Sequence, residues 1–560
     1  MRNVLLLLIS AAILVGGVYI HRSDGSTDPL PVPDLGPVGA TLLDGLGDHT
    51  MPVTSDHPDV QQWFDQGVML TYGFNHEAAE RSFLKAAELD PSCAMCWWGA
   101  ALVLGPNINA SMDPGANAAA WERLQAALAL AGNASEREQA YIRALSARYS
   151  QEAPADRSAL DAAFADAMGE LARSYPDDLD AVTWHAESLM TLQPWDFWDE
   201  AGQPKGNTPE ILASLESVIE RNPDHPGALH LYIHAVEASD EPERGVAAAD
   251  RLRDLIPGSG HLVHMPAHIY ARVGRWNDAV VVNQEAILAD DEYLAVCRPA
   301  PGVYPLGYVP HNHHFLWFAA TMQGSRSIAL GAAEETAART SDPDLMRAEG
   351  MQWLQNFAVT PLLTRVRFGL WDEIVATPQP DADLAYKSAV WHYAQGLAAT
   401  RQDRLDDAES HHAFLAEAVT NPAIVDVLWF DRYSMGKSLA IAERVLAAEL
   451  ASARGDLDSA IEILQAAAVL EDALPYDEPP GWHHPVRQSL GALLLARGDP
   501  EAAEAVYSAE LRRNPENGWS LFGLAKALYE QGRTEEAEQV NARFEAAWAH
   551  ADTELTASAF

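Results

Sequence analysis

The sequence predicts an all-α solenoid built from helix-turn-helix repeats. Three features support this fold class: a 34-residue repeat, helical spacing of apolar residues, and prolines at the ends of repeats. The chain has 560 residues, of which 48% are apolar and 21% are charged, so it can bury a large core. A single compact domain of this length would be unusual, and an array of repeats growing along one axis is the expected arrangement.

The repeat is clearest near the C-terminal end. Gly498 and Ala503 recur after 34 residues as Gly532 and Ala537, within similar local sequences. Apolar residues at helical spacing, as in 457–470, support helices on both sides of such turns. The pairs Asp90-Pro91, Asn222-Pro223 and Asn514-Pro515 are expected to end the second helix of a unit, because proline cannot continue a helix.

This pattern resembles the tetratricopeptide repeat (TPR) family from about Val60 onward. The resemblance implies a right-handed superhelix in which the first helix of each repeat lines a concave groove. Three insertions interrupt the spacing, at 105–114, 195–208 and 293–310, and insertions in solenoids often gather on a binding face. We expect an N-terminal TPR region at 55–340 with a histidine-rich groove, and a C-terminal TPR region at 341–560.

The N-terminus predicts export. Residues 4–20 form an unbroken apolar run, about 25 Å long as a helix. Residues 1–22 are therefore a signal peptide or an N-terminal membrane anchor, and we favour the anchor because no small-residue cleavage site follows. Residues 23–54, rich in Pro, Gly and Asp, read as a flexible linker. The remainder is expected to be periplasmic or otherwise extracytoplasmic, touching the membrane only through the N-terminal segment.

Charge and cysteine content narrow the function further. The formal net charge of −43 and pI near 4.6 repel phosphates, so we expect no nucleic-acid partner. Cys93 and Cys96 could form a local disulfide in an oxidising compartment. Two buried helix residues are the favoured interpretation at this stage.

The most informative residues are histidines that repeat with the solenoid. His230 and His234 recur 34 residues later as His264 and His268, and spacings of three and four place side chains on one helix face. These positions resemble the ones that face the concave groove in the TPR family. We therefore predict that the histidines form one patch on the groove wall and bind a transition metal, copper, zinc or iron. The predicted ligands are His230, His234, His261, His264, His268, His311 and His314. Closely spaced imidazoles also favour one another's neutral, metal-binding form.

Two carboxylates are candidate catalytic residues. Glu237 follows the His230–His234 pair, and Glu187 occupies the register place of His234 one repeat earlier. Either could orient a ligand or act as a general base. Pro266 lies inside the His261–His268 stripe and would loosen the convergence if the helix began there.

The sequence leaves several functions open. Strings such as His261-Leu-Val-His264-Met-Pro resemble a group of large exported bacterial TPR proteins, which implies a specialised groove without naming a reaction. The leading hypothesis is a metal-dependent enzyme, an oxidoreductase or hydrolase acting on a small molecule, with insertion aromatics at 195–198 and 304–308 as pocket walls. The alternatives are a non-catalytic scaffold that binds protein or peptide partners, and a periplasmic metal carrier or sensor. An anion- or peptide-binding groove and a purely structural role for the histidines also remain open.

Overall fold

The computed structural model describes residues 39–300, 302–430 and 432–560. Apart from the two-residue strands β1 (Leu428–Trp429) and β2 (Tyr433–Ser434), the regular structure of these residues is helical. This confirms the predicted all-α class. No helix among the described residues is long and apolar enough to cross a membrane. The signal peptide or anchor predicted at 1–22 lies outside the described residues.

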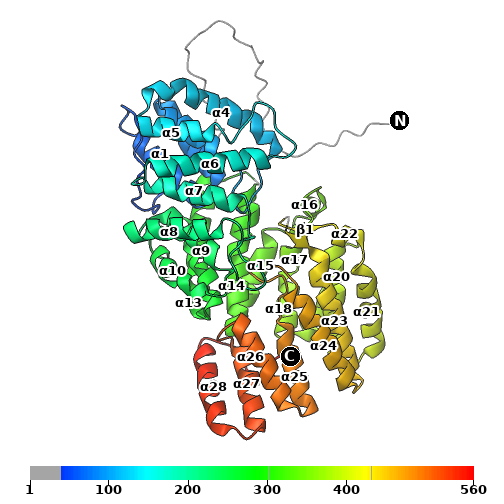
Figure 1. Ribbon diagram of the computed structural model, residues 1–560. Helices are drawn as coiled ribbons and strands as arrows, with labels where there is room; N and C mark the ends of the chain where they lie inside the picture. The colour runs from blue at the N-terminus through cyan, green and yellow to red at the C-terminus, as the bar shows by residue number, and fades with distance from the viewer. Residues whose placement is uncertain (1–38, 301, 431) are drawn as a thin grey trace, which may run out of the picture.

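The helices form antiparallel pairs that stack along the chain (Figure 1). The first half comprises α1 (Val60–Tyr72), α2 (His76–Leu89), α3 (Ala94–Leu102), α4 (Asn117–Leu130), α5 (Glu136–Leu145), α6 (Ser158–Ser174), α7 (Leu179–Thr191), α8 (Thr208–Arg221), α9 (Pro226–Val236), α10 (Val246–Leu252), α11 (Gly260–His264), α12 (Pro266–Arg272), α13 (Trp276–Cys297), α14 (Val309–Gln323) and α15 (Arg326–Ala338). Short 3₁₀ segments lie at η1 (Pro114–Ala116), η2 (Ala131–Asn133) and η3 (Pro242–Gly245), and a π-helical turn at η4 (Tyr304–Tyr308).

The second half follows the same design. It comprises α16 (Pro343–Arg347), α17 (Leu354–Ala358), α18 (Thr360–Arg367), α19 (Trp371–Ala376), α20 (Ala385–Arg401), α21 (Leu405–Ala418), α22 (Pro422–Val425), α23 (Met435–Ala453), α24 (Leu457–Asp472), α25 (Val486–Arg497), α26 (Pro500–Arg513), α27 (Gly518–Glu530) and α28 (Thr534–Ala547). The turn glycines carry out their predicted role: Gly324 and Gly498 end α14 and α25 with φ of 80° and 84°, a conformation that glycine adopts without steric cost.

Pro266 divides the central helix into α11 (Gly260–His264) and α12 (Pro266–Arg272), but the backbone stays helical between them. The structure begins α12 at Pro266, directly after α11, as the sequence suggested. Met265 between them keeps helical backbone angles, with φ −51° and ψ −38°. The one-face spacing of His264 and His268 therefore survives the proline.

The C-terminal repeats fold back onto the middle of the chain. The indole of Trp519 donates to the Thr321 carbonyl at 2.9 Å, and that of Trp276 donates to the Pro515 carbonyl at 2.8 Å. Ser325 donates to the His550 carbonyl at 2.8 Å. Figure 1 shows α26–α28 next to the end of α13 and α14. The second half of the chain is thereby brought against the helices that carry the histidines.

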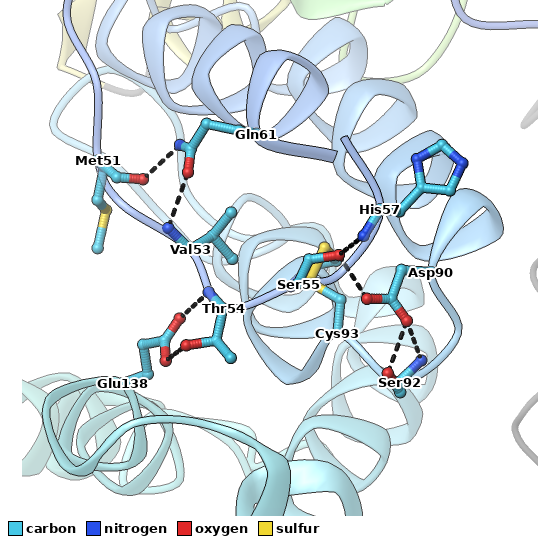
Figure 2. The surroundings of a disulfide bond; sticks show 11 residues. Met51, Val53, Thr54, Ser55, His57, Gln61, Asp90, Ser92, Cys93 and Glu138 are labelled. Atoms are coloured by element: carbon cyan, nitrogen blue, oxygen red, sulfur yellow. Dashed lines mark hydrogen bonds between the residues drawn. A yellow bond between two sulfur atoms is a disulfide. The ribbon is translucent and has the colours of Figure 1, made fainter. Parts of the chain in front are cut away.

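Residues 39–54, predicted as the end of a flexible linker, pack on the first repeats. Thr54 donates its backbone N–H and its hydroxyl to the Glu138 carboxylate at 2.6 and 2.5 Å, and the Val53 N–H donates to Gln61 at 3.0 Å (Figure 2). Met51 is fully buried. Hydrogen bonds and apolar burial hold the segment in place. Neither can be read from its composition.

Cys93 and Cys96 form a disulfide, contrary to the favoured sequence interpretation (Figure 2). Cys93 caps α3 from an extended conformation outside the helix, so its sulfur can reach Cys96 in the first turn. The Cα atoms are 5.4 Å apart, within the range that a disulfide spans.

Candidate metal centre

Six of the seven predicted ligand histidines gather into two triads. The first triad is His230 and His234 of α9 with His261 of α11, and the second is His264 of α11, His268 of α12 and His311 of α14. Within each triad, the ligand nitrogens all lie within 4.8 Å of one another. Five of the six side chains are buried, and His311 is half-buried.

The second triad repeats the first, one unit further along the solenoid. In each, two histidines four residues apart, on α9 in the first triad and on the consecutive helices α11 and α12 in the second, meet a third from the first helix of the next repeat. His261 and His311, the third members, both lie thirteen residues before the turn glycine of their own repeat, Gly274 or Gly324. Stacking identical units places identical side chains at neighbouring positions, as expected for a solenoid.

The ring nitrogens of the second triad lie at ligand spacing. Nε2 of His264 is 2.8 Å from Nε2 of His268 and 3.1 Å from Nε2 of His311. Imidazole ligands about 2.0–2.1 Å from a tetrahedral metal ion have nitrogens about 3.3 Å apart. The spacing therefore matches a shared ion after a small outward shift of the rings.

The outer nitrogens of two of these rings are already used as donors. His264 donates Nδ1–H to Asn283 Oδ1 at 2.7 Å, and His268 donates Nδ1–H to Glu237 Oε2 at 2.5 Å. If both rings were neutral, each Nε2 would be a bare lone pair. Two lone pairs 2.8 Å apart would repel each other, so the contact needs either a proton between the rings, as in an N–H···N hydrogen bond, or a metal ion.

Carboxylates around His268 supply the compensating negative charge. Glu237 contacts it through Oε2, and Glu478 Oε2 lies 3.0 Å from its Nδ1. Burial alone would lower the pKa of His268, but these two carboxylates outweigh it and raise the pKa well above the ordinary value. In contrast, burial and the charges of neighbouring histidines lower the pKa of His264 and His311. A proton on His268 is thus the cation of the metal-free site, and a metal ion can replace it.

Glu237 connects the two triads. Its Oε1 accepts Nδ1–H of His234 at 2.7 Å, and its Oε2 accepts that of His268. In the first triad, His230 donates Nδ1–H to the Tyr72 carbonyl at 2.7 Å, and its Nε2 lies 3.2 Å from Nε2 of His261. Such acceptors fix the ring orientation and the tautomer in which Nε2 is free to ligate.

Aromatic rings enclose both triads. Phe74 lies 4.6 Å from His230 and Phe315 lies 5.0 Å from His268, measured between ring centroids. From the predicted insertions, Trp195 contacts His234 at 5.1 Å and Tyr308 contacts His261 at 4.8 Å. The insertions therefore contribute walls to the site, and the low-dielectric surroundings strengthen its electrostatic interactions.

Two predicted site residues lie outside the triads. His314 stacks on Trp317 with ring centroids 4.9 Å apart, and Phe318 stands four residues after it, at the place equivalent to that of His268. Glu187 is close enough to Tyr72 to affect its phenol, and burial raises the pKa of Glu187 to about 7. Its carboxylate makes no hydrogen bond to a triad histidine among the described residues.

Sequence reasoning missed Glu478 and Asn283. Glu478 comes from the loop 473–485 between α24 and α25, in the string Glu478-Pro-Pro-Gly-Trp-His-His. This string interrupts the helical pattern much as the three recognised insertions do, so the same criterion could have found it. Asn283 had no such signal, since one Asn in a helix is common.

A third group of potential ligands is better explained as structure. His49, Asp180 and His225 lie together, and Tyr72 donates to Asp180 at 2.6 Å. Nδ1 of His225 accepts the Ala228 N–H at 3.2 Å, so its proton is on Nε2, 3.3 Å from Asp180. A protonated Nε2 cannot ligate a metal, and the group instead ties residues 39–54 to the repeats.

Comparison with known proteins supports the repeat family. Residues 494–547 match the family model described as tetratricopeptide repeat, and helix pairs of this kind recur through the described chain. The chain therefore contains tetratricopeptide repeats at residues 494–547. The narrower resemblance to a histidine-rich exported group stays a prediction.

Individual relatives add little about function. Over 100 residues this chain is 42% identical to cellulose synthase operon protein C of Xanthomonas axonopodis pv. citri (strain 306), a match covering 18% of this chain and 6% of that relative. A chain in the crystal structure of the APC/C hetero-tetramer Cut9-Hcn1 is 16% identical in sequence to this chain. The match covers 85% of this chain and 78% of that one, with a TM-score of 0.31. The TPR domain of P58(IPK) is 12% identical with a TM-score of 0.22, covering 85% and 99%. TM-scores this low carry no argument about shared function.

Proposed function

We propose that this TPR protein binds two transition-metal ions, one in each histidine triad. The observation that carries the proposal is the close approach of three ring nitrogens in the second triad, where Nε2 of His264 lies 2.8 Å from Nε2 of His268 and 3.1 Å from Nε2 of His311. The first triad copies the arrangement and adds a buried Nε2 on His234 with no hydrogen-bond partner among the described residues. Glu237 between the triads would balance part of the charge of both ions.

The ligand set favours zinc or copper. Neutral imidazoles suit zinc, copper and iron, and three protein ligands leave a coordination position open for water or a small molecule. A metal ion in such a site lowers the pKa of bound water or activates an oxidant, which is the basis for the hypothesis of an oxidoreductase or hydrolase. Both oxygens of Glu237 are occupied by ring N–H groups, so its role here is to position the ligands.

Elemental analysis of untagged protein tests the proposal. After reconstitution with zinc or copper and removal of weakly bound ions, we expect close to two ions per chain. The variant His268→Ala should lose about one ion, and His412→Ala, which changes a histidine outside the triads, should lose none. Failure of wild-type protein to retain zinc, copper or iron at micromolar free concentrations would refute a metal centre.

A protein-interaction scaffold is the second candidate, because it is the common role of TPR arrays and one surface favours it. Residues of α27 and α28, including Phe522, Lys526, Tyr529 and Asn541, line an open hollow. Tyr529 is 46% exposed. A peptide that binds here equally well with and without metal would establish scaffolding as a separate function. Rapid exchange of bound metal without turnover would instead favour a carrier or sensor.

We also propose an extracytoplasmic location. The apolar run at 4–20 and the Cys93–Cys96 disulfide support it, since disulfides persist mainly in oxidising compartments. Fractionation of cells that produce the full chain tests this: a cytoplasmic pool with reduced cysteines would contradict it.

A further inference from the structure

The third histidine of each triad lacks an anchor that the other two have. Four of the six triad histidines place Nδ1 at hydrogen-bond distance from a backbone carbonyl, a carboxylate or an amide oxygen, namely His230, His234, His264 and His268. Nδ1 of His261 and Nδ1 of His311 have no such partner among the described residues. Because such acceptors normally fix the orientation of a metal-binding imidazole, these two rings need another means of support.

One buried carboxylate, Asp290 of α13, contacts the chain beside both of these histidines. It is 1% exposed, and α13 packs against both α11 and α14. Its Oδ2 accepts the side-chain N–H of Asn312, the residue after His311, at 2.7 Å. Its Oδ1 accepts the hydroxyl of Tyr304 at 2.8 Å. The carboxylate thus holds one donor from α14 and one from the π-helical turn before it.

The same carboxylate lies against the residue before His261. A Cβ atom added to Gly260 would come within 2.1 Å of Asp290 Oδ1, so this close approach requires glycine. Tyr304 also lies at the backbone of His261: burial and Asp290 raise the pKa of the Tyr304 phenol, and the His261 backbone lowers it. Asp290 therefore supports the start of α11 both directly and through Tyr304.

Packing alone does not account for a carboxylate at this place. Burial of a charge is unfavourable unless the charge is hydrogen-bonded, and burial raises the pKa of Asp290 to about 7. Buried ionic groups can often be replaced by apolar side chains without loss of stability. What a carboxylate adds is a pair of acceptor oxygens, which hold one donor beside each of the two unanchored ligands.

We propose that Asp290 is a positioning residue for both metal sites. Through Tyr304 it fixes the start of α11, and through Asn312 it fixes the first turn of α14. Those two segments carry the third ligand of each triad, so one carboxylate keeps both ligands within reach of an ion. The inference rests on the proposed function and adds to it a residue that acts through the backbone rather than on the rings.

Zinc affinity measured by competition with a chromophoric chelator tests the proposal, at pH 8 so that Asp290 is mostly ionised. Asp290→Asn keeps the size of the side chain but turns an NH₂ group toward one of the two donors. We expect both sites to lose about tenfold in affinity, the lower end of the range for groups that orient metal ligands. The matched control is Asp291→Asn, because Asp291 is exposed and pairs with Arg339 at 2.9 Å. This variant should bind zinc as wild type does.

Two further substitutions separate positioning from general stability. Tyr304→Phe removes the hydroxyl beside α11 and should weaken zinc binding mainly at the first triad. Asn312→Ala removes the donor on α14 and should weaken it mainly at the second. Each is measured in His264→Ala, which leaves the first triad, and in His234→Ala, which leaves the second. A variant that merely loosened the fold would weaken both sites and lower the melting temperature of the metal-free chain.

The metal-free chain supplies a readout that needs no metal binding. Brief treatment with diethyl pyrocarbonate modifies accessible imidazoles, and mass spectrometry gives the rate at each histidine. Asp290→Asn should raise the rates at His261 and His311 severalfold and leave that at His412 unchanged.

The outcomes distinguish this inference from the metal centre itself. Retention of no zinc by wild-type protein would refute the metal centre, whereas the modification rates would still test whether Asp290 holds the two rings. The role of Asp290 is overturned if the folded Asp290→Asn variant binds zinc within twofold of wild type at both sites, or if neither modification rate rises. If that variant fails to fold by circular dichroism, Tyr304→Phe and Asn312→Ala decide, and equal losses at both triads in each would overturn the proposal.

Discussion

Replacing Glu237 with Gln tests the link between the two triads. Its two carboxylate oxygens accept one N–H each, from His234 at 2.7 Å and from His268 at 2.5 Å. Glutamine has the same shape but offers one carbonyl oxygen and one NH₂ group. One of the two imidazoles therefore faces a donor and must turn away or change tautomer.

The structure sets the size of the expected effect. Removing a carboxylate that orients a metal-bound histidine costs roughly 10–100-fold in metal affinity, or about 1.4–2.8 kcal/mol at 1.4 kcal/mol per factor of ten. Because Gln can still serve one ring, we expect the loss mainly at one of the two sites. The two ions should then bind with clearly separated affinities.

The assay is a competition titration of zinc between the protein and a chromophoric chelator, at fixed pH and ionic strength. Glu216→Gln is the matched control, because Glu216 is half-exposed and bonds to Tyr232 and Arg244 away from the histidines. Affinities within twofold of wild type in Glu237→Gln would refute the idea that Glu237 positions the ligands.

Three further outcomes follow from the same structure. His264→Ala and His234→Ala should each remove one of two bound ions, whereas His314→Ala should keep both; elemental analysis counts the ions, and equal losses in all three would contradict the division into triads. Removal of bound metal with a chelator should lower the melting temperature measured by calorimetry, since an ion at a free concentration of 100 times its Kd adds about 2.7 kcal/mol to native stability. An unchanged melting temperature would contradict tight binding. Burial and the nearby Glu510 charge raise the pKa of Glu471, so the native state keeps a proton that the unfolded chain releases above about pH 4.3. The free energy of unfolding should therefore fall as pH rises from that point to the raised pKa. Chemical denaturation at pH 5 and 8 should show a smaller fall for Glu471→Gln than for wild type, and an equal fall in both proteins would count against the raised pKa.

Local chemistry explains why the helix pairs were predictable. Turn glycines such as Gly324 and prolines such as Pro266 affect the backbone within a few residues of their own position. The 34-residue period repeats these local signals along the chain. The correspondence between His230 and His264, and between His234 and His268, came from the same period. The repeat thereby located the histidines that form the two triads.

The failures involve contacts that the period does not govern. His314 occupies a correct register place but lacks a partner, because Phe318 replaces the second histidine. The disulfide depended on Cys93 lying just outside its helix, a boundary that periodicity resolves poorly. Residues 39–54 were predicted as part of a linker because residues 23–54 are rich in Pro, Gly and Asp, yet specific hydrogen bonds hold them to the repeats.

By itself, the sequence determined which residues form helices and which histidines occupy equivalent places, because both follow from interactions between near neighbours in the chain. Only the tertiary structure decided how those histidines divide into two triads, since that depends on the rotation between successive repeats. It also decided that Glu478, 210 residues after His268, completes the site. That contact exists because the C-terminal repeats pack back against α13 and α14, and it depends on the summed geometry of every repeat between them.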